Sequence, residues 1–398
     1  MSNISTTLTS CQSTILAAKA YMNLILHILY STYSQTLFIE NSDGADADRL
    51  DLNLKPDLKS SSNTGAKSAT FTSIKNALNH EFILATACLS IATGSLGCTY
   101  CDAGSYESAA LQFQSAASIW RYYCSMLYDD NNKNCSCTLP RPMEEAKIIP
   151  VSMGAAEAMI ILNLAYAQQM NVASKLCNDE KNSQKPLMTF GCHDNHLMAK
   201  LTLGIAEQIQ QVLDKVFLFE YQLKEEQTLI DKRFIQILHL QKQVQSVLSK
   251  YFLSCAVWEE SQGCTFAITL MKEVEKELGH VQILDRSSSL QYNHSSFLQD
   301  IAALKAHVRN INCIWQQQVD KNCTEIGGQQ PKIPPIMLLQ SGVILYKEPD
   351  PYNIREDPSF PPIADNLNEI HSKPPGYNTA TIEVTTTKPN SLDELYVL

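Results

Sequence analysis

Two short motifs hold the residues of this sequence that are best suited to chemistry. Cys98-Thr-Tyr-Cys101 has the spacing of half a zinc site or of a redox dithiol, and His193-Asp-Asn-His196 could place two imidazoles on one helical face. A structural zinc ion needs four ligands, yet no second CxxC and no histidine pair follows at a metal-site interval. We interpret the first motif as a packed helical turn and the second as a solvated helix start, with no metal bound.

No catalytic signature accompanies these motifs. The sequence lacks a Gly-rich phosphate loop, HExxH, GxSxG and a dinucleotide fingerprint, and its paired carboxylates (Glu225-Glu226 and Glu259-Glu260) fit solvated helical faces. We therefore predict a protein that is not an enzyme and needs no cofactor. A thiol- or metal-dependent enzyme that uses Cys98 and Cys101 is an alternative, which a metal assay on the purified protein would test.

The composition of the chain indicates which classes of partner it can bind and in which compartment it resides. The formal net charge of −10 disfavours binding to nucleic acid or to anionic lipid, because both reward clustered Lys and Arg. Thirteen scattered cysteines in a chain of 398 residues suggest reduced thiols rather than a disulfide framework. The apolar stretch Ile15–Tyr30 is too short and too polar for a membrane span. We expect a cytoplasmic protein without a transmembrane segment, whose membrane association is indirect.

The elements that must position any site are long helices. Between His196 and Leu278 there is no proline, and apolar residues recur at three- and four-residue spacing. The segment from Ile230 to Trp258 would span roughly 45 Å as one helix, which outruns an ordinary compact core. The sequence thus predicts an all-α fold in which elongated antiparallel helices pack along their lengths.

The remaining elements follow the same pattern. Tyr106 to Leu127 alternates alanines with aromatic residues on one face, which is typical of a tetratricopeptide-like hairpin, and we place its preceding turn at Gly94 and Gly97. Residues 41–69 form a polar insert. The prediction is a helical domain at residues 1–346, closed by an extended strap that ends near residue 346, and a proline-rich, disordered tail at residues 347–398.

The tail carries two candidate peptide ligands. Pro374-Pro375-Gly376-Tyr377 matches the Pro-Pro-x-Tyr form that WW domains bind, because its prolines favour an extended left-handed helix and its tyrosine fills a second pocket. Tyr396 and Leu398 give the chain an apolar end of the kind that a PDZ groove captures by strand addition. Both patterns are short and also occur by chance.

From about Tyr21 to Tyr346 the chain resembles the Bro domain family. The resemblance rests on four segments in order: Gly94–Trp120, the alanine–glutamine run in Ala155–Lys175, Leu197–Leu201 then Gln208–Leu213 together with Phe234–Leu240, and Asn310–Trp315 followed by Ile333–Ile336. It implies a boomerang-shaped helical domain with a tetratricopeptide-like core. The polar insert at residues 41–69 has no place in the family pattern.

The resemblance also implies a partner and a site. Bro domains bind the C-terminal amphipathic helix of an ESCRT-III subunit, a charged multivesicular body protein, in endosomal sorting. Aligned by motif, the partner-helix groove falls on Ile209, Leu213, Leu229 and Ile230, where Ile209→Asp or Leu213→Asp should weaken binding. We expect a monomeric adaptor recruited to endosomes, which could also reach a WW-domain ubiquitin ligase through Tyr377. The alternative is a tetratricopeptide-like or rhophilin-like interaction scaffold unrelated to ESCRT-III.

Overall fold

The computed structural model describes residues 2–42, 64–128, 153–182, 194–222, 232–260, 265–287, 295–326 and 342–360. Within these ranges the chain is helical apart from the turn at residues 103–105, Asp194 and the segment 342–360, and the predicted all-α class is confirmed. The helices are α1 (Ser2–Ser42), α2 (Thr64–Asp102), α3 (Tyr106–Tyr128), α4 (Met153–Asn182), α5 (Asn195–Gln222), α6 (Lys232–Glu260), α7 (Thr265–Ser287) and α8 (Ser295–Ile326).

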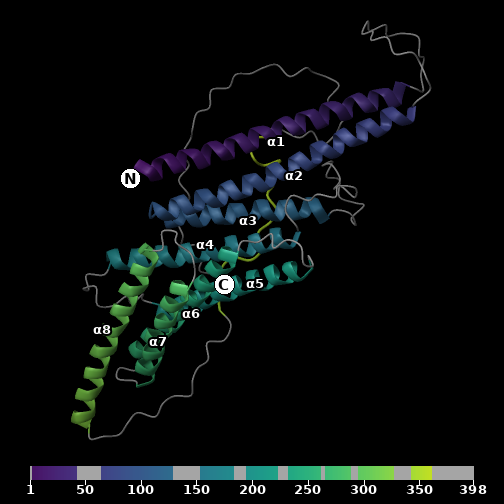
Figure 1. Cartoon of the computed structure of the whole chain (residues 1–398). Helices are drawn as coiled ribbons and strands as arrows, with labels where there is room; N and C mark the ends of the chain where they lie inside the picture. Colours follow the sequence, from purple (N-terminus) through teal and green to yellow (C-terminus); the bar gives the residue numbers. More distant parts are fainter. Residues whose placement is uncertain are drawn as a thin grey trace. The chain divides into compact units, whose positions relative to one another are not determined.

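The helices stack in the order of the chain. Each helix packs chiefly against its neighbours in sequence, as Figure 1 shows. Helices α4 to α8 share the largest hydrophobic cluster, and a second cluster around Trp120 and Tyr123 joins α2, α3 and α4. This serial packing agrees with the antiparallel array that the long helical periods predict.

Helix α2 is apolar because it lies between two neighbours. Its segment Ala77–Asp102 is long and apolar enough to cross a membrane, but most of that segment is buried inside the protein. Gly94 and Gly97 do not mark a turn, as the sequence suggested, but lie inside α2. A Cβ atom at Gly97 would approach the ring of Phe113 to 3.0 Å, so this glycine allows close packing of α3. The turn is at Gly104, whose φ of +73° favours glycine.

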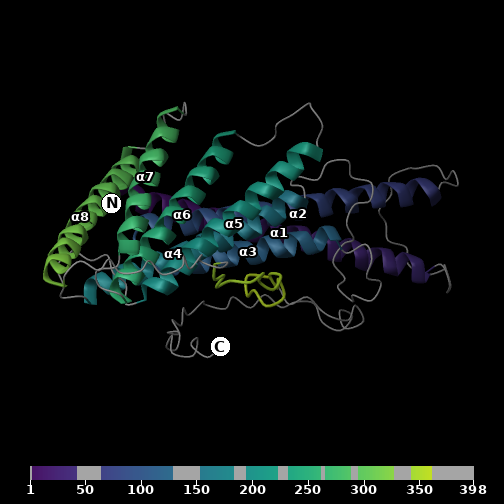
Figure 2. The same cartoon turned by 90° about the horizontal axis from the view of Figure 1, so that it is seen from below.

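A non-helical segment, residues 342–360, crosses the helices on one side and is called the strap below (Figure 2). Gln168 of α4, fully buried, fixes its start. The Gln168 side chain donates to the carbonyl of Val343 (2.9 Å) and accepts from the amide of Leu345 (2.9 Å). The amide of Val343 donates to the carbonyl of Lys200 on α5 (3.1 Å). The strap thereby satisfies its own backbone groups against two helices.

The far end of the strap is bound to α3 and α1. The amide of Tyr352 donates to the carbonyl of Ser118, and Lys19 forms an ion pair of 2.6 Å with Asp357. Although burial opposes ionisation, the hydrogen bonds from Lys19, Tyr352 and Ser359 lower the pKa of Asp357 to about 2. Asp357 therefore stays charged at neutral pH and joins the two ends of the described chain.

The boundary of the helical unit lies later than predicted. The packed unit runs from Met1 to Pro361, because Ile354 and Phe360 are buried where the sequence suggested a tail after residue 346. The prolines and polar residues of this stretch are typical of disorder, but here they flank two buried apolar side chains, Ile354 and Phe360. Part of the predicted insert at residues 41–69 is also helical, since α1 ends at Ser42 and α2 begins at Thr64.

Candidate functional site

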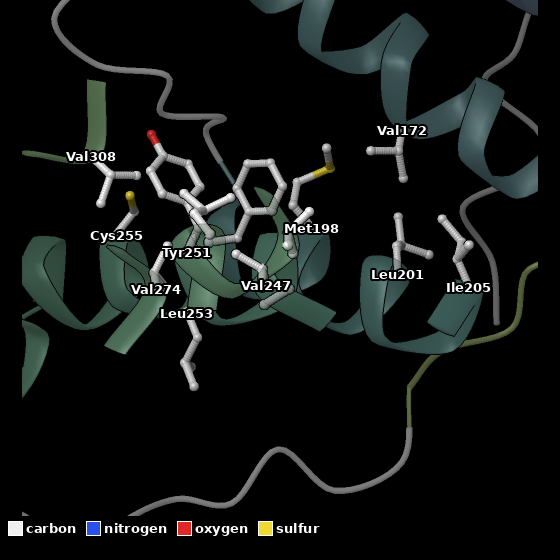
Figure 3. Close-up of a cluster of buried hydrophobic side chains, with 14 of the residues drawn as sticks. Val172, Met198, Leu201, Ile205, Val247, Tyr251, Leu253, Cys255, Val274 and Val308 are labelled. Atoms are coloured by element: carbon white, nitrogen blue, oxygen red, sulfur yellow. The ribbon is translucent and has the colours of Figure 1, made fainter. Parts of the chain in front are cut away.

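Two of the four residues predicted to line the partner groove are in the core. Ile209 and Leu213 lie on α5 and each has 0% of its surface exposed. They belong to the cluster that α5 shares with Leu238 and Val247 of α6, part of which Figure 3 shows around Met198, Ile205 and Val247. The prediction that Ile209 and Leu213 contact a partner is therefore wrong. A stripe at helical spacing has the same sequence pattern whether it faces a core or a ligand.

The outward side of α5 is polar. Lys200, Gln211 and Asp214 are exposed on it, and Glu207 accepts a hydrogen bond from the amide of Gly342 at the start of the strap (3.0 Å). This side offers no apolar stripe to a partner helix. Accessible apolar side chains lie instead on helix α6, which follows α5.

The other predicted site residues lie outside the described residues. These are the remaining groove residues, the WW-ligand motif and the chain end, namely Leu229, Ile230, Pro374, Pro375, Tyr377, Tyr396 and Leu398. Their assignments remain predictions from the sequence.

Helix α6 carries a partly exposed apolar stripe. Phe234, Ile237, Val244 and Leu248 recur at three, ten and fourteen residues from the first and are only half-buried. Three of them also pack against the core cluster from outside. Because they keep apolar surface in water at one helical face, they can take the apolar side of another helix without any rearrangement. We call these four residues the α6 stripe.

Tyr166 of α4 meets the α6 stripe at its middle. The Tyr166 hydroxyl donates to the side-chain carbonyl of Gln241, which lies between Ile237 and Val244 (3.2 Å). The ring of Tyr166 packs against Phe113 of α3 at a centroid distance of 5.5 Å. Burial raises the pKa of the hydroxyl, so Tyr166 stays neutral and keeps its donor proton. Helices α4 and α6 thus contact each other directly, although α5 lies between them in sequence.

The exposed side of α2 is also apolar. Leu84, Cys88, Ile91 and Cys98 recur at four, seven and fourteen residues, and all four are exposed. Cys98 lies close enough to Tyr166 to contribute to the raised pKa of its hydroxyl. Sequence reasoning missed Tyr166, because a lone tyrosine in an alanine-rich helix is not distinguished from a core residue.

The Cys98–Cys101 pair lacks the features of an activated dithiol. Both residues lie at the end of α2; partial desolvation, with the neighbouring acidic groups, raises the pKa of both thiols. A nucleophilic thiol needs a lowered pKa, which a nearby cation or a helix N-terminus supplies. Within the described ranges no group of three or more His, Cys, Asp or Glu side chains could hold a metal ion.

The second motif contains a helix cap. The Asp194 carboxylate accepts a hydrogen bond from the amide of Leu197 (3.0 Å), which is the N-cap interaction at the start of α5. His196 lies 2.7 Å from Glu260 at the end of α6, and His193 is outside the described residues. Asp194 therefore caps the start of α5, as the sequence indicated, whereas His196 joins that start to the end of α6.

Comparisons with known proteins assign no family to the chain. No family model matches it, and no curated protein matches it. Among solved structures, the chain is similar to one in the structure described as "ALIX BRO1 CHMP4C complex", with 14% sequence identity and a TM-score of 0.44. The similar region covers 72% of this chain and 67% of that chain.

Proposed function

We propose that the chain is a non-enzymatic adaptor of the Bro domain type, which binds the C-terminal amphipathic helix of an ESCRT-III subunit. The partner class rests on the four ordered sequence segments between Tyr21 and Tyr346. The binding surface rests on one observation, the contact of Tyr166 with Gln241 in the middle of the α6 stripe (3.2 Å). An amphipathic helix recognises such a surface through apolar residues at matching spacing.

This surface replaces the one that the resemblance implied on α5. It lies on α6 and α4, the two neighbours of α5, and the α6 residues are partly accessible whereas Ile209 and Leu213 are not. Within the Bro domain family, we propose that the chain is most like the stand-alone protein Brox. The function we infer is recruitment to endosomes from the cytoplasm, through the ESCRT-III subunit rather than through a membrane segment.

Replacing Val244 by aspartate is the direct test of the α6 stripe. Val244→Asp places a carboxylate where the partner helix would bury an apolar side chain, and we expect about 30-fold weaker binding, or ~2 kcal/mol. The measurement is fluorescence anisotropy with labelled peptides from the terminal helices of each ESCRT-III subunit. The full chain is titrated against each peptide in turn.

Leu111→Asp is the matched control. Leu111 is 60% exposed on α3, outside the α6 stripe, so the same charge there should leave peptide binding unchanged. Thermal unfolding of both variants shows whether they remain folded. Equal binding by folded Val244→Asp and by the unsubstituted chain would refute the α6 surface, and the absence of binding to any peptide would refute the partner class.

The tail motif extends the proposal to a second partner. We expect Tyr377→Ala to abolish binding to WW domains, because the tyrosine fills the second pocket of the WW groove. The measurement is a pull-down of the full chain with a panel of WW domains from ubiquitin ligases, and the control is Tyr396→Ala, which alters only the PDZ-type end. Retained WW binding by Tyr377→Ala would remove this motif from the proposal.

A further inference from the structure

The α6 stripe is interrupted at its middle by one amide side chain. Its apolar members leave an interval of seven residues between Ile237 and Val244, and half-buried Gln241 lies within that interval. With Gln241 included, the positions from Phe234 to Leu248 recur at alternating intervals of three and four residues, which is the spacing of a coiled-coil seam. Gln241 therefore occupies a position against which a partner helix would bury a side chain of its own.

The Gln241 amide has a fixed orientation. The Tyr166 hydroxyl donates to Oε1 of Gln241 (3.2 Å), and the Tyr166 ring is held in turn against Phe113 at a centroid distance of 5.5 Å. The other end of the amide, Nε2, carries two hydrogens. Within the described part of the chain no group accepts these hydrogens, and Nε2 is not sealed from solvent. Gln241 thus presents a hydrogen-bond donor at the middle of the α6 stripe.

A donor at this position selects the side chain that it meets. A leucine of the partner would bury the Nε2 hydrogens without an acceptor, and a lysine would set donor against donor. A side-chain oxygen satisfies them, as one buried polar pair fixes the register of a coiled coil. A carboxylate is favoured over an amide oxygen, because α6 has basic residues such as Arg233 and Lys242 but no Asp or Glu before Glu259.

We propose that Gln241 sets the register of the partner helix by binding one of its carboxylates. The bound helix carries this Asp or Glu between two apolar residues that are about seven positions apart and that pack beside Ile237 and Val244. Tyr166 is the positioning residue, because its hydroxyl keeps Nε2 of Gln241 turned towards the carboxylate. The inference rests on the proposed function and names the chemistry that the same surface selects.

The test is a double-mutant cycle between the full chain and the ESCRT-III terminal peptide that binds most tightly, measured by fluorescence anisotropy. Each Asp and Glu of the peptide is replaced in turn by leucine. We expect one replacement, between the two apolar anchors, to weaken binding to the unsubstituted chain about 10-fold. Against Gln241→Leu the same replacement should cost nothing, because two leucines then meet. The control is Gln243→Leu, an exposed α6 residue outside the seam, which should bind every peptide as the unsubstituted chain does.

Tyr166→Phe tests the positioning role separately. A peptide with lysine in place of the selected carboxylate should bind the unsubstituted chain about 100-fold more weakly than the original peptide, because the ammonium group and Nε2 both donate. Without the Tyr166 hydroxyl the Gln241 amide can turn and offer Oε1 to the lysine, so this difference should shrink to about 10-fold. A merely structural loss would weaken both peptides by the same factor. Thermal unfolding checks that each variant is folded.

The outcomes separate the register from the surface. If a peptide binds and Val244→Asp weakens it, but no single carboxylate of the peptide is coupled to Gln241, the register inference is overturned and the α6 surface stands. The leucine scan of the peptide against the unsubstituted chain decides this even without the Gln241 variant. An unchanged preference against lysine in Tyr166→Phe overturns the positioning role of Tyr166. Absence of binding to every peptide overturns the proposed function and this inference together.

Discussion

Ile209→Asp and Leu213→Asp are expected to unfold the protein rather than to weaken a partner's binding. Each side chain has 0% of its surface exposed and lies between α5 and its neighbours. A carboxylate there would lose its water and gain no counter-ion, and we expect a destabilisation of about 4 kcal/mol or more. The measurement is the free energy of unfolding from urea denaturation followed by circular dichroism.

Val244→Asp is the comparison that separates the two interpretations. Val244 is half-buried on the α6 stripe, so its carboxylate can reach water and the cost in unfolding free energy should be clearly smaller. If Ile209→Asp unfolds at the same urea midpoint as the unsubstituted chain, then Ile209 is accessible. That result would support the partner groove that the sequence predicted on α5. A stable Leu213→Asp variant would lead to the same conclusion.

Gly204→Ala is expected to displace the strap. A Cβ atom at Gly204 of α5 would lie inside van der Waals contact with the carbonyl oxygen of Val343, and a Cβ atom at Gly342 would in turn meet the backbone of Gly204. Backbone atoms cannot rotate away as a flexible side chain can, so either the strap or α5 must shift. We expect a loss of roughly 1–3 kcal/mol in the free energy of unfolding, which is typical of overpacking.

The strap itself gives the more specific measurement. Its anchoring bonds to Gln168 and Lys200 lie beside Gly204, so Gly204→Ala should accelerate proteolytic cleavage within residues 342–360. Gly154→Ala is the control: a Cβ atom there meets nothing within 4 Å, and alanine favours the helix. Unchanged cleavage and unchanged stability in Gly204→Ala would show that the strap is not held at this position.

The sequence predicted the helices better than the surfaces they form. Helix α3 begins at Tyr106 as predicted, and the long helix expected from Ile230 to Trp258 is α6, which begins at Lys232. These boundaries follow from apolar spacing and breaks in it, which are local properties of the chain. The burial of Ile209 is not local, because it depends on whether α4 and α6 cover both sides of α5.

Two further differences have the same physical origin. Gly94 and Gly97 resemble turn residues in sequence, but the packing of α3 explains them, since Phe113 occupies the space that a side chain at Gly97 would need. The prolines after residue 346 resemble a disordered tail, yet Ile354 and Phe360 are buried against the helices. In both cases the deciding contact lies with a distant part of the chain, where local composition carries no information.

The Lys19–Asp357 ion pair has a consequence for how the protein is made. Its two members are separated by 338 residues, whereas each helix packs chiefly against its neighbours in sequence. Helices leaving the ribosome can therefore dock one after another, but Lys19 must wait for its counter-ion until nearly all of these residues have been translated. We expect the nascent chain to assemble progressively from its first helix, and the Lys19–Asp357 ion pair to form only after Asp357 has left the ribosome.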